Sequence, residues 1–189
     1  MNKIGIYGGT FDPIHHAHLI LAREALEQLE LDEVIFVPAA RSPHKPGGHT
    51  TPAAVRLEML QAALAGEKYF SIDERELSRP PPSFAIDTIE DFARSHTGRK
   101  IFYLIGSDNL PRLHTWHRVD DLRKLVEFVV LDRGHGATDL SFRTIRRPLE
   151  ISATEIRKRV AEGRSIRYLV PPVVEEIIRW HNLYQDSHR

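Results

Sequence analysis

The sequence predicts an α/β protein built on a doubly wound, mostly parallel β-sheet with helices on both faces. Apolar runs typical of buried strands alternate along the chain with amphipathic helical patterns. These runs are nearly continuous, as in strands covered on both faces. Two of them end in glycine-containing turns, "YGGTF" and "LIGSD". Because ligands bind beyond the C-terminal ends of strands in such sheets, a site is expected at these turns.

The first half of the chain sets this alternation. The run "KIGIYGG" over 3–9 predicts a buried strand that ends in a glycine turn. Leu19, Ala22, Leu26 and Leu29 then recur on one helical face. The next elements are expected to be a strand over 33–39, a Gly- and Pro-rich loop over 41–52, a helix over 53–65 and a strand over 69–78.

The second half continues the pattern. Ile86, Ile89 and Ala93 mark an amphipathic helix after the stiff connector "RPPPS". Strands are expected over 100–108 and 127–132, a helix over 152–163, and a last helix over 171–184 that two prolines open. The length and the lack of an internal repeat predict one domain over 1–189.

Composition excludes several classes of protein. The 26 Lys and Arg residues balance 26 Asp and Glu residues, so no nucleic-acid partner is expected. The absence of cysteine removes disulfides, thiolate metal sites and cysteine nucleophiles. No apolar run approaches the length of a membrane span, and the start "MNKIGIYGG" is too short for a signal peptide. A cytoplasmic protein without a membrane partner is expected.

The stretch "GGTFDPIHHAH" begins with a pattern suited to anions. Gly8 and Gly9 permit a tight turn and a close ligand, and Thr10 adds a hydroxyl and an N–H. The positive end of the following helix points to the same place. The glycine spacing fits neither the P-loop nor G-x-G-x-x-G. A plain strand-ending turn is therefore an equal alternative for the glycines alone.

The histidines of this stretch admit two interpretations. His15 and His18 are three residues apart, so they share a helical face and can donate hydrogen bonds to one phosphate. A metal site would need further ligands, for which only Asp12 and His16 lie nearby, and His16 would point away. With eleven histidines in the chain, a helix start rich in His is the structural alternative.

A second anion-binding pattern lies near the other end of the chain, in "ISATEIR" over 151–157. Ser152 followed by Glu155 is a capping-box pattern, which by itself means only a helix start. Ser152, Thr154 and Arg157 can also face one anion at that helix N-terminus.

Together the two end motifs resemble the HxGH nucleotidylyltransferase superfamily. Within it, "GGTFDP", "SPHK", "GSD", "TWH" and "ISATEIR" follow one another as in the bacterial nicotinate mononucleotide adenylyltransferase family. This resemblance covers nearly the whole chain and implies a Rossmann-like fold. It also implies transfer of the adenylyl group of ATP to nicotinate mononucleotide, giving deamido-NAD and pyrophosphate in NAD biosynthesis.

The resemblance assigns roles to particular residues. The catalytic residues would be His15, His18 and Arg157. The ATP-binding residues would be Gly8, Gly9, Thr10, His15, His18, Gly106, Asp108, Ile151, Ser152, Thr154 and Arg157. The substrate-binding residues would be His44, Lys45, Ser83, Phe84, Ala85 and Trp116. Mg²⁺ is implied as a cofactor held mainly by the ATP phosphates, with no protein metal ligand. A homo-oligomer is left open.

Two departures from the family pattern bear on function. Ala17 stands where the family motif has glycine, and its methyl group can crowd a phosphate or a neighbouring backbone. Ser83-Phe84-Ala85 stands where relatives read Ser-Tyr-Thr, which weakens strict selection of the acid over the amide. In relatives the backbone N–H groups of this segment contact the nicotinate carboxylate, so recognition does not depend on the lost hydroxyls.

Three alternatives remain at the level of the sequence. A related adenylyltransferase could use nicotinamide mononucleotide or pantetheine phosphate. A noncatalytic nucleotide-binding protein could share the fold, with Ala17 as a sign of decay. A histidine-ligated metal hydrolase is the third, and metal content would distinguish it.

Overall fold

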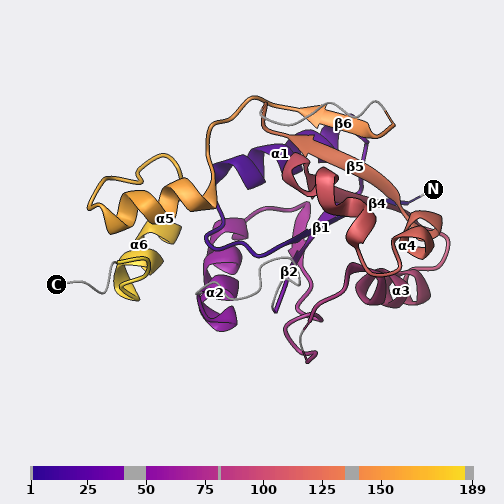
Figure 1. Ribbon diagram of the computed structural model, residues 1–189, viewed down its shortest axis with the longest axis horizontal. Coiled ribbons are helices and arrows are strands. Elements are labelled where there is room, and N and C mark those ends of the chain that lie inside the picture. The colour runs from indigo at the N-terminus through magenta and orange to yellow at the C-terminus, as the bar shows by residue number, and fades with distance from the viewer. Residues whose placement is uncertain (1, 41–49, 81, 135–140, 186–189) are drawn as a thin grey trace.

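The computed structural model describes residues 2–40, 50–80, 82–134 and 141–185 and is an α/β fold (Figure 1). The strands of the described residues are β1 (Lys3–Gly9), β2 (Glu33–Pro38), β3 (Phe70–Ile72), β4 (Lys100–Gly106), β5 (Glu127–Asp132) and β6 (Arg143–Arg146). The helices are α1 (His16–Gln28), α2 (Ala53–Leu64), α3 (Ala85–Ser95), the 3₁₀ helix η1 (Ser107–Thr115), α4 (Val119–Leu125), α5 (Ala153–Ala161) and α6 (Pro172–Trp180).

The six strands form one sheet in the order β3-β2-β1-β4-β5-β6, and every neighbouring pair is parallel. The predicted fold class is thus confirmed. The chain starts in the centre with β1, winds outward to β3, and returns to β4 on the other side of β1. The strand order therefore reverses between β1 and β4, which is where an open sheet of this kind forms its ligand crevice.

Alternation along the strands divides the core into two layers. Ile4 and Ile6 of β1 pack on one face with α3, η1 and α4, whereas Tyr7 packs on the other face with α1, α2, α5 and α6. Side chains of a strand point to opposite faces in turn, and most positions of β1, β2, β4 and β5 are apolar and buried. Both faces of the sheet are covered, as predicted.

Some predicted elements are wrong in extent. The strand expected over 69–78 spans only Phe70–Ile72. Asp73 ends it, because its carboxylate accepts hydrogen bonds from the backbone N–H of Arg75 at 2.9 Å and from its Nε at 2.8 Å. The last helix ends at Trp180, so 181–184 lies beyond it. The short elements η1, α4 and β6 had no clear pattern in the sequence.

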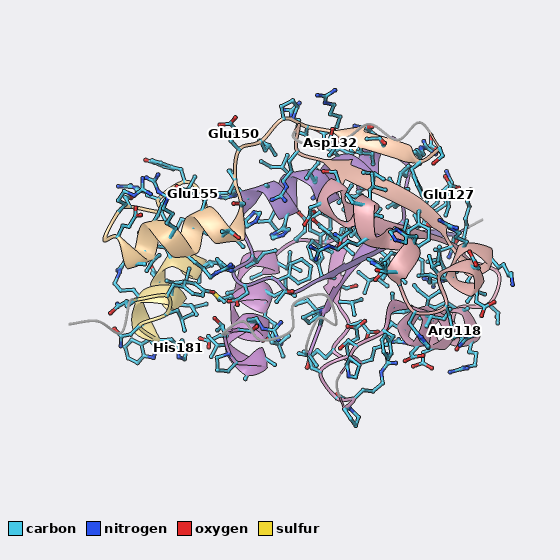
Figure 2. The ribbon with its side chains drawn as sticks, in the orientation of Figure 1. Arg118, Glu127, Asp132, Glu150, Glu155 and His181 are labelled. Carbon is cyan, nitrogen blue, oxygen red and sulfur yellow. The ribbon has the colours of Figure 1, made fainter. Side chains whose placement is uncertain are left out.

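Charged side chains are spread around the outside of the protein (Figure 2). Arg118, Glu155 and His181 lie at separate points of its edge. Many of the exposed charges form local ion pairs, such as Arg118 with Glu90 at 2.8 Å. No described helix has the length and apolar character needed to cross a membrane.

Candidate active site

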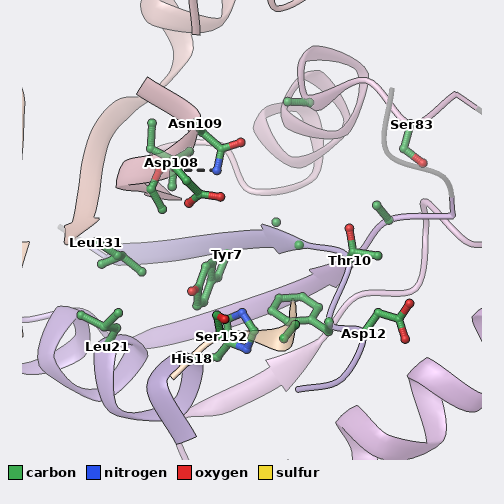
Figure 3. Close-up of a pocket in the computed structure, with 18 of the residues that line it drawn as sticks. Tyr7, Thr10, Asp12, His18, Leu21, Ser83, Asp108, Asn109, Leu131 and Ser152 are labelled. Atoms are coloured by element: carbon green, nitrogen blue, oxygen red, sulfur yellow. Dashed lines mark hydrogen bonds between the residues drawn. The ribbon is translucent and has the colours of Figure 1, made fainter. Parts of the chain in front are cut away.

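A pocket of about 620 Å³ opens at the C-terminal ends of β1 and β4, where the strand order reverses (Figure 3). Residues from distant parts of the chain line it. They include Gly8, Gly9, Thr10, His15 and His18 from the first motif, Gly106 and Asp108 where β4 meets η1, Ser83, Phe84 and Ala85 at the start of α3, Trp116 after η1, and Ser152, Thr154 and Arg157 of the late motif.

Gly8 and Gly9, the last two residues of β1, owe their identity to packing. A Cβ on Gly8 would lie 2.7 Å from the hydroxyl of Tyr103, and a Cβ on Gly9 would lie 2.7 Å from the ring of Phe11. Both glycines line the pocket at the end of the strand. The sequence predicted a turn that is open to a ligand, but it did not reveal why side chains are excluded there. Tyr103 and Phe11 occupy the space that a Cβ would need.

The imidazoles of His15 and His18 stack at the start of α1. Their ring centroids are 3.7 Å apart and their planes meet at 21°. His15 is the residue that precedes the helix, and its carbonyl accepts the backbone N–H of His18 at 2.9 Å. The predicted shared face is confirmed, and Phe11 packs edge-on against His18 at 5.2 Å.

His15 is a neutral imidazole in this setting. Its side chain is 1% exposed, and burial, with the nearby charges of Arg133 and His16, lowers its pKa to about 3. Its Nδ1 is buried without a hydrogen-bond partner among the described residues. A buried polar atom of this kind has a cost unless something satisfies it, so His15 is suited to meet a polar ligand group in the pocket.

The late motif forms the adjoining side of the pocket. Ser152 precedes α5, and its Oγ accepts the backbone N–H of Glu155 at 3.1 Å, so the predicted capping contact is present. The hydroxyl retains its own proton to donate. Arg157 donates from Nη1 to the carbonyl of Asp12 at 2.8 Å. This contact joins α5 to the first motif across 145 residues of sequence.

The ends of β4 and β5 contribute a third group. Asp108 lies in the first turn of η1 and is exposed, and Arg133 follows β5. A guanidinium nitrogen of Arg133 lies 3.9 Å from the Asp108 carboxylate, and its Nη1 donates to the carbonyl of Ile151 at 3.0 Å. Sequence analysis missed Arg133, although its place after the strand "EFVVLD" is where the rule for such sheets puts ligand contacts.

The opposite wall of the pocket is less charged. Phe84 stacks in a tilted arrangement on His117, with centroids 4.6 Å apart, and Trp116 packs edge-on against Tyr103 at 6.0 Å. Ala85 begins α3 after Phe84, and no side chain caps that helix end. The wall therefore combines aromatic surface with backbone N–H groups that α3 leaves without helical partners.

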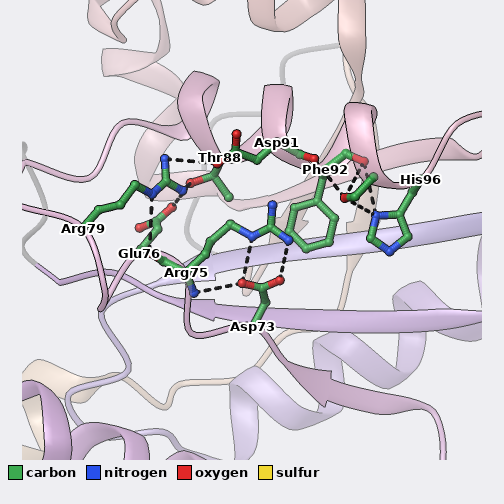
Figure 4. A network of polar contacts seen from close by, with 9 residues as sticks. Asp73, Arg75, Glu76, Arg79, Thr88, Asp91, Phe92 and His96 are labelled. Atoms are coloured by element: carbon green, nitrogen blue, oxygen red, sulfur yellow. Dashed lines mark hydrogen bonds and ion pairs between the residues drawn. The ribbon is translucent and has the colours of Figure 1, made fainter.

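A buried polar network supports this wall (Figure 4). Thr88 of α3 donates to Glu76 at 2.7 Å and accepts from Arg79 at 2.9 Å. Glu76 also interacts with the hydroxyl of Ser83, which accepts the backbone N–H of Ala40 at 3.2 Å. Burial raises the pKa of Glu76. The short hydrophilic stretch after β3 thus fixes the start of α3, which sequence analysis did not foresee.

The structure brings together nearly all of the predicted site residues. Ile151 does not line the pocket, but its carbonyl holds the pocket residue Arg133. His44 and Lys45 lie outside the described residues. Ala17 is buried and lines the pocket beside the histidines.

The described residues contain no group of three His, Asp or Glu side chains arranged to hold a metal ion. The carboxylate of Asp12, the local candidate ligand, accepts the hydroxyl of Tyr184 at 2.6 Å and the backbone N–H of Thr51 at 3.1 Å. Both of its oxygens are thus engaged by the protein.

Comparison with known proteins identifies the family of the chain. Residues 6–159 match the cytidylyltransferase-like family model. The protein is therefore a nucleotidyltransferase in fold and in class. Two similar proteins are both named "Probable nicotinate-nucleotide adenylyltransferase". The one from Exiguobacterium sibiricum is 46% identical and the alignment covers 96% of this chain and 98% of that relative. The one from Shouchella clausii is 40% identical over the full length of both.

The chain belongs to the nicotinate-nucleotide adenylyltransferase family, as its sequence motifs indicate. A solved structure shares the fold with a TM-score of 0.83 and 22% identity, covering 97% of this chain and 98% of that chain. It is the nicotinic acid mononucleotide adenylyltransferase of Plasmodium falciparum, complexed with NaAD.

Proposed function

We propose that the protein transfers the adenylyl group of ATP to the phosphate of nicotinate mononucleotide, giving deamido-NAD and pyrophosphate in NAD biosynthesis. One observation carries the proposal. Two polar motifs from opposite ends of the chain meet on one side of the pocket, and an aromatic wall with free backbone N–H groups lies on the other. The first side suits the phosphates of ATP, and the second suits a flat, negatively charged ring.

The chemistry requires positioning and charge stabilisation. A phosphate oxygen of the mononucleotide forms a bond to the α-phosphorus of ATP while the bond from that phosphorus to the bridging oxygen breaks. Pyrophosphate leaves with the electron pair. The attacking group is already an anion, so the protein needs no nucleophile of its own.

The residues on this side of the pocket have two separate roles. His15, held neutral, and His18 donate hydrogen bonds to oxygens of the α-phosphate as negative charge builds up on them. Ser152, Thr154 and Arg157 hold the outgoing phosphates, and the planar fork of the guanidinium suits two oxygens at once.

The mononucleotide occupies the other side of the pocket. Trp116 stacks on the nicotinate ring, and the N–H groups at the start of α3 donate hydrogen bonds to the carboxylate. The Ser83 hydroxyl is engaged by Ala40 and Glu76, and the side chains of Phe84 and Ala85 have no hydrogen-bond donor. This segment therefore offers the ligand backbone donors.

Mg²⁺ would enter with ATP. The described residues offer no acidic cluster for it, and the Asp12 carboxylate is engaged, so the phosphate oxygens would hold the ion and neutralise part of their charge.

A substrate panel tests the proposal. Purified protein is given ATP, Mg²⁺ and, in turn, nicotinate mononucleotide, nicotinamide mononucleotide and pantetheine phosphate, and pyrophosphate release is measured. We expect kcat/KM for the nicotinate compound to exceed that for the amide by at least about tenfold, the factor for one charge-assisted contact. Equal values would refute the acid selectivity and implicate Phe84-Ala85. Release with pantetheine phosphate alone would refute the proposed substrate.

A further inference from the structure

Asp12 is a junction between four distant parts of the chain. Its carboxylate accepts the hydroxyl of Tyr184 at 2.6 Å and the backbone N–H of Thr51 at 3.1 Å. Its carbonyl accepts Nη1 of Arg157 at 2.8 Å. Beside it, Arg56 is 1% exposed and donates from Nη1 to the carbonyl of Thr10 at 2.7 Å. Asp12 itself is 6% exposed and lines the pocket.

We propose that Tyr184, in the turn that follows α6, is a positioning residue for ATP: its hydroxyl holds the Asp12 carboxylate and so fixes the turn 10–13 that faces the phosphates. This inference rests on the proposed function and goes beyond it. The C-terminal segment becomes part of the frame of the nucleotide site, although Tyr184 itself does not line the pocket.

The backbone on both sides of this hydrogen bond is held in an uncommon conformation. Phe11 has φ +48° and Tyr184 has φ +60°, in the left-handed region that bulky residues rarely adopt. Such conformations persist only where the surroundings over-determine them. The turn 10–13 thus depends on its neighbours, and the contact with Tyr184 bridges 172 residues of sequence.

The charge of Asp12 gives the contact a functional consequence. A carboxylate at the edge of a phosphate site repels the ligand if it swings into the pocket. Tyr184 and Thr51 each donate to one of its two oxygens, and so hold the carboxylate in one orientation. Without the hydroxyl, one oxygen loses its donor and the side chain gains freedom next to the ligand.

The Tyr184→Phe variant tests this step, because it removes one oxygen atom and leaves the ring that packs on the core. Tyr168→Phe is the matched control: Tyr168 also lies in the left-handed region, at φ +69°, but is 77% exposed. The Kd for ATP is measured by calorimetry, and KM for each substrate by pyrophosphate release, well below both melting temperatures.

We expect Tyr184→Phe to raise the Kd and the KM for ATP by about tenfold, as for one lost hydrogen bond to a charged acceptor. The KM for the mononucleotide should stay within about twofold, since independent sites do not couple. In an Asp12→Asn background the same change should have much less effect, because Tyr184 acts through that carboxylate. Tyr168→Phe should match the wild type.

Three results would overturn the inference. One is unchanged ATP binding with only a lower melting temperature, which would make Tyr184 purely structural. Another is an equal rise in both KM values, which would mean general loosening. The third is full additivity with Asp12→Asn. If the wild type binds ATP but releases no pyrophosphate with any mononucleotide, the proposed function fails, and the calorimetric Kd still decides the role of Tyr184.

Discussion

Lowering the pH from 7 to 5 should destabilise the folded protein through His15. Burial, with the charges of Arg133 and His16, lowers the pKa of this imidazole from 6.5 to about 3. In the unfolded chain the group regains its ordinary pKa, so the unfolded state takes up a proton first as the pH falls. The stability that depends on neutral His15 is therefore complete above pH 6.5 and is lost progressively down to about pH 3.

The size of the effect follows from that pKa difference. At pH 5 the unfolded chain is protonated at this position and the folded protein is not, which costs about 2 kcal/mol relative to pH 7. The loss at pH 5 hardly depends on the exact folded value, because any pKa below about 4 gives nearly the same result. For a chain of this length it corresponds to a fall in melting temperature of about 4–8 °C.

Urea unfolding at pH 7, 6 and 5 measures this loss directly. The wild type is compared with His15→Gln, which cannot take up the proton, and with His114→Gln, which removes an exposed histidine as a control. The stability of His15→Gln should fall by about 2 kcal/mol less than that of the wild type between pH 7 and 5. An identical pH dependence in the wild type and His15→Gln would refute the conclusion that the fold holds this imidazole neutral.

Three substitutions test other parts of the site. His18→Ala should lower kcat by about a hundredfold or more, with a smaller change in ATP affinity, because a donor preorganised for the transition state is lost; normal single-turnover chemistry would contradict this. Arg157→Lys keeps the charge but not the fork, so KM for ATP should rise by about tenfold with little change in melting temperature; unfolding would mark a structural arginine. Arg56→Met leaves one buried and two partly buried carbonyls without their donor and should cost about 3–5 kcal/mol in urea unfolding; a loss below about 1 kcal/mol would disprove the stabilising role of these three hydrogen bonds.

The strands that build the site were predictable because their burial leaves a plain signal. Nearly continuous apolar runs identified β1, β2, β4 and β5, and parallel pairing then placed the ends of β1 and β4 together. Of the two edge strands, β3 was predicted with the wrong extent and β6 was not predicted. β3 has only three residues, and in β6 only Ile145 is buried, so neither carries a full pattern.

The motif residues of the pocket could be found from their local order in the sequence. The buried charged residues that hold them in place could not. "HHAH" and "ISATEIR" are compact patterns with a chemical meaning in themselves. Arg56 lies in the first turn of α2 and Glu76 in a polar stretch, where charged residues are normally exposed. Each becomes buried only because a distant segment supplies its partner, such as Thr10 for Arg56. No local spacing encodes such a pairing.

Ala17 shows how a departure from the motif can leave its chemistry intact. If Ala17 were a sign of lost function, the change from glycine should have removed a hydrogen-bond donor. Substitution of glycine by alanine removes none, since the backbone N–H remains, and alanine in a helix is more stable than glycine by about 1 kcal/mol. Ala17 lies in the first turn of α1 and is fully buried between the two histidines in sequence, whose rings stack beside the pocket. Its methyl group lines the pocket beside them, while His15 and His18 retain the stacked geometry on which the proposed charge stabilisation at the α-phosphate depends.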